Sequence, residues 1–341
     1  MKGKLIQNVC IVFLLVLGAT ATQANAAVFT VGINGGENYS SIQEAVNNAQ
    51  NGDTILVSPG VYRENVNVNK ELTIISSELS GDRVNRTYVI GAVPTNDVFG
   101  ISSSNVTISG FHIVGGPSGI DGYQEVGLYL DGVQNCLLSN NTLMLNDAGI
   151  ALNNSQRNLL DNNIIGLGND GISLSRSNEN RLLNNMVTTN SEGIRMDNST
   201  NNTFLNNTID SNEIGIVLAT SRMNMLEHNL VSRNNNGLIL TEMSESNTLF
   251  NNSLYMNGVG IYLKGSSGNM IYLNKFFNFL NAEDEGKNTW NTSSAGNLWE
   301  DYNGTDADGN GIGDTPYIVN QTTGSIDYLP LANNISSGGT Q

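Results

Sequence analysis

"EGIRMDNSTNNTFLNNTIDSN", residues 192–212, is rich in asparagine and also carries regularly spaced large apolar residues. Its glycine belongs to a column that repeats every 22 residues five times and then after 23: Gly127, Gly149, Gly171, Gly193, Gly215, Gly237 and Gly260. One and three positions after each glycine stands Ile, Leu or Met, such as Ile194 and Met196. This alternation is typical of a strand with one face buried, so the repeat predicts one strand at this place in every unit.

Three asparagine columns share the same period. The first holds Asn141, Asn163, Asn185, Asn207, Asn229, Asn252 and Asn274; the second holds Asn158, Asn180, Asn202, Asn224, Asn247 and Asn269, with Cys136 in the first unit; the third holds Asn146, Asn190, Asn212, Asn234 and Asn257. Asparagine tolerates the left-handed backbone of a tight corner. Stacked at about 4.8 Å, equivalent amides can also hydrogen-bond in a ladder. We therefore expect the asparagines to turn the chain and to bond to one another along the stack.

Each unit thus contains three short apolar segments separated by Gly or Asn corners, without a helical stretch. The sequence predicts an all-β fold, a right-handed parallel β-helix that forms a three-sided solenoid of 22-residue coils. The alternative is a leucine-rich repeat, whose period includes 22 residues. That fold would place leucine where Asn185 stands and would include a helical half, and the sequence has neither.

The two ends of a solenoid expose sheet edges, so caps are expected. "SSIQEAVNNAQNGD" has a capping box from Ser41 to Glu44 and an apolar helical face, which predicts a short N-terminal capping helix. Residues 79–97 are expected to form an inserted loop. We divide the chain into a signal peptide at 1–26, a β-helix at 27–281 with regular repeats at 126–281, and an irregular C-terminal cap or tail with an Asp-rich loop at 282–341.

The signal peptide is predicted from Lys2 and Lys4, an apolar run at 9–17 and a small-residue cleavage motif at 24–26. The alternative is an uncleaved membrane anchor, for which the apolar run is short. After cleavage no transmembrane span is expected, and the protein would be secreted or at the cell surface. With 31 acidic and 15 basic residues, the surface would repel nucleic acid, so no nucleic-acid partner is expected. Cys136 alone would remain, which excludes an intrachain disulfide.

The sequence resembles the secreted parallel β-helix proteins with NosD-type repeats, which are linked to carbohydrate-binding and sugar-hydrolase (CASH-like) modules and are common among archaeal surface proteins. The resemblance spans residues 29–332 and rests on "IQEAVNNAQNGDTILVSPGVYRENV", the Gly-Ile and Asn-Asn repeats, and "GNLWEDYNGTDADGNGIGDTPY". It implies the fold more strongly than an activity, because this scaffold carries lyases, hydrolases, epimerases, adhesins and a maturation factor for the copper site of nitrous oxide reductase.

Calcium is the first candidate cofactor. "DADGNGIGD" places Asp306, Asp308, Asn310 and Asp314 at positions 1, 3, 5 and 9 of an EF-hand-like loop, as oxygen ligands for calcium. The twelfth position is Tyr317, so the closing bidentate carboxylate is missing. The alternative is a turn with solvated charges.

An acidic stripe before the repeat glycines is the second candidate site. Asp147, Asp170 and Glu192 lie in neighbouring columns, with Arg195 three residues after Glu192. Paired carboxylates share a proton, bind a cation or act on substrate, and pectate-lyase-like enzymes and glycosidases use such groups. These four residues are therefore candidate catalytic residues. The alternative is a corner of splayed, solvated acids.

Copper is an unlikely cofactor, because copper needs clustered His, Cys or Met, and His112 and His228 are about five coils apart. Tyr129 and Tyr262 at exposed strand positions, with Tyr123 and Tyr255 near corners, are candidates for stacking on sugar rings.

Three functions follow from these patterns. The favoured one is a secreted or cell-surface protein that binds or scaffolds polysaccharide or a surface glycan. The alternatives are a polysaccharide lyase, hydrolase or epimerase acting on an acidic glycan, and a NosD-like accessory factor in copper-site maturation. Whether the chain is an enzyme, and its oligomeric state, are left open.

Overall fold

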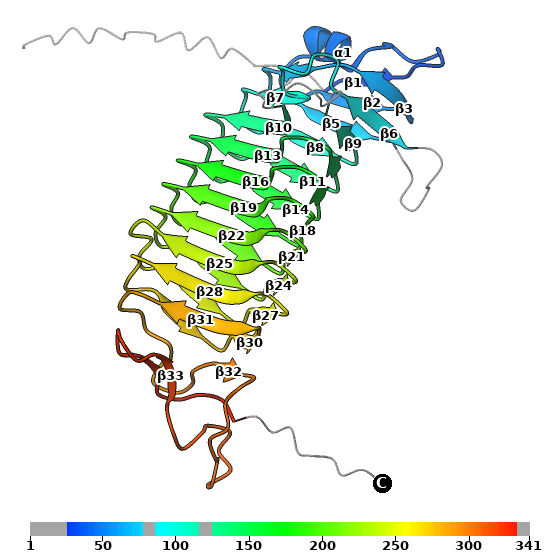
Figure 1. The fold of residues 1–341 in the computed structure, drawn as a ribbon. Coiled ribbons are helices and arrows are strands. Elements are labelled where there is room, and N and C mark those ends of the chain that lie inside the picture. Colours follow the sequence, from blue (N-terminus) through cyan, green and yellow to red (C-terminus); the bar gives the residue numbers. More distant parts are fainter. Residues whose placement is uncertain (1–25, 78–85, 116–124, 333–341) are drawn as a thin grey trace, which may run out of the picture.

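The computed structural model describes residues 26–77, 86–115 and 125–332. They form an elongated tube of stacked coils, with a short helix at the N-terminal end and irregular segments at the C-terminal end (Figure 1). Three parallel sheets run the length of the tube. The prediction of an all-β, three-sided parallel solenoid with coils of about 22 residues is therefore confirmed.

Each coil from β2 to β31 contributes one strand to each of the three sheets, A, B and C, and β1 and β32 each add one further strand, to sheets A and B. Sheet A contains β1 (Val28–Val31), β2 (Thr54–Val57), β5 (Thr73–Ser76), β8 (Thr107–Ser109), β11 (Leu137–Ser139), β14 (Leu159–Asp161), β17 (Arg181–Leu183), β20 (Thr203–Leu205), β23 (Met225–Glu227), β26 (Thr248–Phe250) and β29 (Met270–Tyr272). Sheet B contains β3 (Gly60–Arg63), β6 (Thr87–Ile90), β9 (His112–Val114), β12 (Thr142–Met144), β15 (Ile164–Gly166), β18 (Met186–Thr188), β21 (Thr208–Asp210), β24 (Leu230–Ser232), β27 (Ser253–Tyr255), β30 (Lys275–Phe277) and β32 (Leu298–Trp299). Sheet C contains β4 (Val66–Val68), β7 (Phe99–Ile101), β10 (Val126–Asp131), β13 (Ala148–Asn153), β16 (Asp170–Ser175), β19 (Glu192–Asp197), β22 (Ile214–Ala219), β25 (Asn236–Thr241), β28 (Val259–Lys264) and β31 (Leu280–Asp284).

Two expected boundaries differ from these strands. The segment 79–97, expected as an inserted loop, contains β6, which pairs with β3 and β9 in sheet B. At the other end, β31 crosses residue 281 and still pairs with β28, and β32 continues sheet B.

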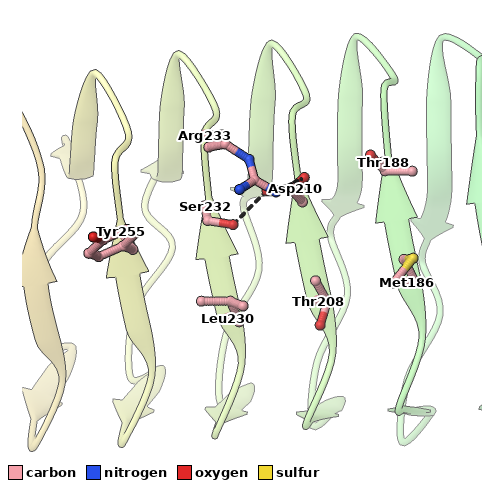
Figure 2. A pocket seen from close by; sticks show the side chains of 8 residues that line it. All are labelled: Met186, Thr188, Thr208, Asp210, Leu230, Ser232, Arg233 and Tyr255. Carbon is pink, nitrogen blue, oxygen red and sulfur yellow. Dashed lines mark hydrogen bonds and ion pairs between the residues drawn. The ribbon is translucent and has the colours of Figure 1, made fainter.

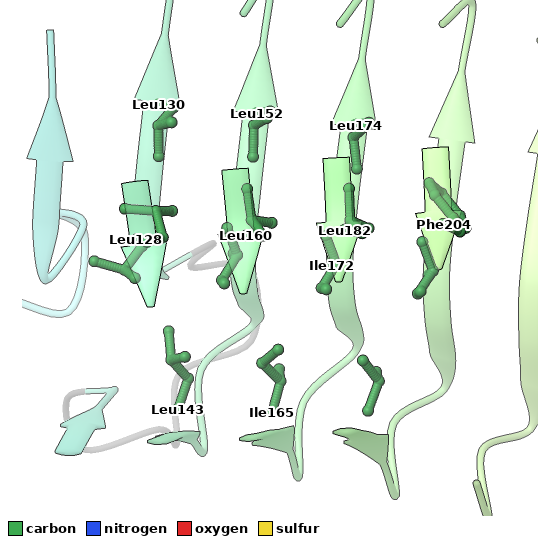
Figure 3. Close-up of a cluster of buried hydrophobic side chains, with 14 of the residues drawn as sticks. Leu128, Leu130, Leu143, Leu152, Leu160, Ile165, Ile172, Leu174, Leu182 and Phe204 are labelled. Atoms are coloured by element: carbon green, nitrogen blue, oxygen red, sulfur yellow. The ribbon is translucent and has the colours of Figure 1, made fainter. Parts of the chain in front are cut away.

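The core is a set of files of identical or similar side chains. Strands pair in register, so Ile194 lies beside Ile216 and Leu182 beside Phe204. Figure 3 shows these files from the three sheets, with inward side chains of each coil stacked on those of the next. Apolar files exclude water from the whole interior, which is the main favourable contribution to folding.

The asparagine ladders are present as predicted. Asn185 donates its backbone N–H to Asn207 Oδ1 at 2.9 Å and its Nδ2 to the same oxygen at 3.0 Å. Asn207 Nδ2 donates in turn to Asn229 Oδ1 and to the Leu182 carbonyl. Asn207 is 1% exposed, so these bonds satisfy amides that would otherwise be buried without partners.

The chain is turned by other residues than we expected. In the Asn-Asn pairs, the left-handed backbone belongs to the residue before the ladder asparagine, for example Asn206 with φ 57°.

The glycine column is not at a corner either, because these glycines lie inside the strands of sheet C. A Cβ on Gly193 would stand 2.5 Å from the Gly215 carbonyl oxygen. These glycines are needed because the backbones of successive coils approach closely there.

The N-terminal end is closed by α1 (Ile42–Asn48), as predicted. Ser41 is its N-cap, and its side chain accepts the Glu44 backbone N–H at 3.2 Å. The buried residues of the helix are Ile42, Ala45 and Val46. The helix covers the first coils with apolar side chains.

The C-terminal end closes the ladders with carboxylates. The Nδ2 of Asn288 donates to Asp284, and the Nδ2 of Asn281 donates to Asp301. Asn297 donates to Asp327 twice, through its backbone N–H at 2.7 Å and through its Nδ2. Buried Trp290 and Trp299 donate their indole N–H groups to Asp284 and Asp327, each at 2.9 Å. The antiparallel pair β33 (Tyr317–Asn320) and β34 (Ser325–Asp327) carries Asp327. Each ladder therefore ends with its last amide donor on an Asp oxygen.

Candidate functional site

The predicted acidic group lies on the outward face of sheet C. Asp170 and Glu192 open β16 and β19 and are register partners, so their side chains lie one coil apart in the same row. Asp147 is outside this row, because Ala148 is the partner of Asp170. Asp147 instead accepts a hydrogen bond from Asn169 Nδ2. The structure brings together Asp170, Glu192 and Arg195 and leaves Asp147 at the edge.

Arg195 is held between two carboxylates. Its Nη1 lies 3.0 Å from Glu192 Oε2 and its Nε 2.7 Å from Asp197 Oδ2, and its side chain is 36% exposed. Hydrogen bonds to Asp197, together with those to Glu192, raise the pKa of Arg195 above its usual value. The guanidinium therefore stays charged and fixed in orientation.

Asp170 is the titratable member of the group. Burial and the neighbouring Glu192 carboxylate raise the pKa of Asp170 to about 6, against a partial opposing effect of Arg195. A carboxyl group with this pKa can donate or accept a proton near neutral pH.

A stretch of small outward side chains lies beside the acids. The next outward row along sheet C reads Tyr129, Ala151, Ser173, Arg195. Two coils with small side chains therefore separate the tyrosine ring from the guanidinium, by about three strand steps or 14 Å. We call the surface over Ala151 and Ser173, with its borders Tyr129 and Arg195, the sheet C seat.

The third outward row supplies further polar groups that the sequence analysis missed. Asn153 donates to Asp131 at 2.8 Å and accepts from Arg176 Nη2 at 2.6 Å. Counting 22 residues along the outward positions of each strand would have found this row. The seat thus has fixed hydrogen-bond donors and acceptors on two sides.

The residues of the predicted calcium loop fold into a turn. Asp306 accepts the backbone N–H groups of Asn310 at 3.0 Å and Gly311 at 2.9 Å, and Asp308 accepts from Asn310. Asp314 lies apart from these contacts and accepts from Thr305 and from the Ala307 backbone. Within 26–77, 86–115 and 125–332, no three His, Cys, Asp or Glu side chains are arranged to hold a metal ion. Calcium binding here stays a prediction.

The histidines and the cysteine are placed on different parts of the tube. The His112 ring lies 5.1 Å from Tyr88 on sheet B, His228 Nδ1 lies 3.0 Å from Glu227 beside sheet A, and Cys136 is buried.

The outward tyrosines differ in their surroundings. Tyr262 donates to Glu285 at 2.6 Å. Tyr255 is the last residue of β27, next to the turn residue Met256, and it faces outward. Tyr123 and the predicted signal peptide, apart from Ala26, lie outside the described residues.

Sheet B carries an open cavity that the sequence analysis missed. It has a volume of about 220 Å³ and crosses β18, β21, β24 and β27. Figure 2 shows its floor of Met186, Leu230 and Tyr255, and the Arg233 side chain bonded to Asp210 at its edge. An adjoining cavity of about 170 Å³ shares Leu230 and Tyr255 and extends to Lys275 and Phe277. We call the two cavities together the sheet B trough.

In the part of the chain that the structure describes, no helix is long and apolar enough to cross a membrane.

Known proteins resemble this chain in sequence and in fold. A "Cell surface glycoprotein" of Methanothermus fervidus is 35% identical over 114 residues, which are 33% of this chain but only 16% of that protein. Among solved structures, the Dettilon tailspike protein (gp208) aligns with a TM-score of 0.59 and 15% identity, over 73% of this chain and 55% of the tailspike. XylC in complex with xylose aligns with a TM-score of 0.54 and 11% identity, over 74% and 75%. At these identities the structures show a shared fold alone.

The sequence model of one family, described as "Periplasmic copper-binding protein (NosD)", matches residues 46–224 and 171–304. The described His and Cys side chains do not fit a copper centre, since His112 lies in sheet B, His228 lies at the corner after β23, about five coils away, and the cysteine is buried. The matched residues cover more than half of the chain and coincide with the stacked coils. The chain therefore belongs to the NosD family of parallel β-helix proteins.

Proposed function

We propose that this protein is secreted or held at the cell surface, where it binds or scaffolds polysaccharide through the sheet C seat. The observation that carries the proposal is the outward row Tyr129, Ala151, Ser173, Arg195, in which small residues leave room between an aromatic ring and a fixed cation. The similarity to an archaeal cell surface glycoprotein supports the location.

The chemistry of the seat suits a ligand rich in hydroxyl groups. Arg195 and Arg176 offer N–H donors, and Asp170, Glu192 and Asn153 offer acceptors. Tyr129 supplies an apolar ring face next to them. A pyranose ring is similar in length to the coil spacing of about 4.8 Å, so a sugar chain along the tube would meet equivalent positions at each residue.

Filling the seat tests this proposal. Ser173→Trp places a bulky ring over the seat and removes only the Ser173 hydroxyl, while Tyr129, Arg195 and the acids stay in place. Thr203→Trp is the matched control, because Thr203 is also half-buried and outward-facing, but on sheet A. On an array of polysaccharides, the wild type and the control should bind the same polymers, and Ser173→Trp should lose at least about tenfold in affinity. Equal binding by both variants, or no binding by the wild type, contradicts the proposal.

A second candidate function is an enzyme that cleaves or epimerises an acidic glycan. The observation that favours it is the pKa of Asp170, raised by burial and by Glu192 to about 6, which suits a general acid or base. Incubation with polygalacturonate, with and without calcium, should then produce unsaturated or reducing ends. Asp170→Asn should abolish this product, and Asp161→Asn on sheet A should not. Absence of product with the wild type counts against the enzyme.

A third candidate is an accessory role in copper-site maturation, which family membership favours. Isothermal titration with Cu(I) and Cu(II) tests whether the chain itself carries the metal. Binding that His112→Ala or His228→Ala weakens would favour this role over the first two.

A further inference from the structure

We propose that the sheet B trough is a second binding site, and that it takes a strand of acidic polysaccharide. The inference goes beyond the function proposed for sheet C, because it rests on a different face and on different residues. Its ligand is a polymer whose sugar rings carry carboxylates, such as a uronic-acid polymer.

The charge on sheet B differs from that of the rest of the chain. The outward strand positions from β12 to β30 carry a single carboxylate, Asp210, and a single lysine, Lys275. The chain as a whole has 31 acidic and 15 basic residues. An anionic polymer would be repelled by most of the surface of such a chain. Sheet B is the face on which it meets the least repulsion.

The negative charge of Asp210 is compensated by hydrogen bonds from its own neighbours. It accepts from Ser232 Oγ at 2.6 Å, from Arg233 Nη2 at 2.7 Å and from Ser211 Oγ at 3.0 Å. Burial alone would raise its pKa, but these hydrogen bonds lower the pKa of Asp210 below its usual value. The carboxylate is thus ionised and fully engaged, and it serves to position Arg233.

Arg233 offers the rest of its guanidinium to a ligand. One nitrogen is fixed on Asp210, while the side chain remains 62% exposed at the edge of the trough. A fixed planar guanidinium is suited to binding a carboxylate with two hydrogen bonds. Lys275 is exposed and lies two strands further along, level with Leu230, because Leu230 pairs with Ser253 and Ser253 with Lys275. It adds a second cation about 14 Å from Arg233, from about 10 Å across two strand spacings and about 10 Å along three residues.

The floor between these cations fits sugar rings. Leu230 and Tyr255 are shared by both cavities, and both side chains are substantially exposed. Phe277 packs beside Tyr255 with ring centroids 6.1 Å apart. Exposed apolar side chains in a continuous trough mark a contact surface. Aromatic side chains can cover the apolar faces of rings, while Thr188 and Thr208 offer hydroxyl groups in the lining.

Two faces with different ligand preferences would let one molecule contact two polymers at once. The seat on sheet C and the trough on sheet B lie on different sides of the rigid tube. A protein of this kind would cross-link the polymers of a cell surface.

The test compares polygalacturonate with the same polymer after full methyl esterification, which removes the carboxylate charges and keeps the backbone. By isothermal titration at low salt, the wild type should bind the acid form at least about fivefold more tightly than the ester. Arg233→Gln, Lys275→Gln and Tyr255→Ala should each weaken binding of the acid form by about five- to tenfold. Tyr255→Ala is informative because it leaves the Asp210 to Arg233 pair intact.

The matched control is Arg181→Gln, which removes an exposed arginine from an outward position of β17 on sheet A. It should bind as the wild type does, and all variants should unfold at the wild-type temperature. An equal loss in Arg181→Gln shows unspecific attraction and overturns the proposal. Unchanged binding in Arg233→Gln and Lys275→Gln also overturns it. A loss confined to Ser173→Trp assigns acidic polymers to sheet C and likewise rejects the trough.

Discussion

The inner corners and the outward strand faces of the tube use the same 22-residue period in different ways. At the inner corners the same residue returns in coil after coil, as in the ladder through Asn185, Asn207 and Asn229. On the outward faces the residue changes at each step, as in the row Tyr129, Ala151, Ser173, Arg195. Repetition is required where buried amides must satisfy one another, and variation is permitted where water can do so. The varied positions are therefore the ones available for recognition.

The largest effect is expected inside a ladder. Asn207→Ala removes the acceptor of two donors of Asn185 and leaves the Leu182 carbonyl without its amide donor, so we expect a loss of about 4 kcal/mol in the free energy of unfolding. Asn206→Gly, one residue away, should change it by less than about 0.5 kcal/mol, because Asn206 is exposed and its left-handed backbone suits glycine. Denaturant unfolding measures both. Similar losses would show that the inner and outer positions do not differ as we describe.

A slightly smaller effect is expected where a ladder ends. Asp327 is 0% exposed and accepts hydrogen bonds from Asn297, Trp299 and Leu329. Asp327→Ala leaves these donors unsatisfied, and we expect a loss of about 3 kcal/mol. The exposed Glu283→Ala is the control and should be neutral. Hydrogen exchange that speeds up first in the C-terminal coils would locate the damage. Unchanged exchange there would mean that the carboxylate does not hold the cap.

The interior of the molecule could be predicted from the sequence because its physical requirement repeats. Seven glycines and three asparagine columns state the same constraint several times, so a single misleading copy such as Cys136 does not obscure it. The residue that makes each turn could not be predicted. A repeat gives the spacing of Asn206 and Asn207 but does not tell which of them adopts the left-handed backbone.

The outward sites could be predicted only in part. Asp170 and Glu192 were found because equal charges one coil apart stand out in the sequence. Tyr255 was found as a candidate for stacking on sugar rings. The sheet B trough around it was missed because Leu230, in a strand of three residues, looks like a core residue until the inward phase of the strand is known. A short strand contains too few alternations to fix that phase.

A smaller effect is expected from pH at the outward acid pair. The pKa of Asp170 is about 6 in the folded chain, against an ordinary value of 3.8. Between these values the folded state binds more protons than the unfolded state, so the free energy of unfolding falls as pH rises from about 4 to 6. Asp170→Asn should remove this part of the pH dependence. Because Asp170 is partly exposed and water screens its charge, we expect the free energy of unfolding to fall by only about 1 kcal/mol over this pH range. Thermal unfolding at several pH values measures it, and an identical pH profile in the variant would exclude Asp170 as its source.

The smallest effect concerns the predicted calcium loop. If Asp306, Asp308, Asn310 and Asp314 bind calcium, a concentration equal to Kd should raise the free energy of unfolding by about 0.4 kcal/mol, and more at higher concentration. Excess chelator should reverse the gain, and Asp306→Ala should abolish it. Calcium that leaves the wild-type melting temperature unchanged at millimolar concentration would show that the loop is a turn held by its own backbone N–H groups.

The direction of the ladders has a consequence for how such proteins change in size. Within each asparagine ladder the bonds from one asparagine to the next run toward the C-terminal cap, where a carboxylate accepts the last one. Near the other end, the backbone N–H of Phe111 is the first donor, to Asn141 Oδ1. Removing 22 residues from the middle, for instance 171–192, would join two compatible surfaces and leave both caps untouched. Deleting or inserting whole coils can therefore make the molecule shorter or longer. It then carries fewer or more outward positions, and neither cap has to change.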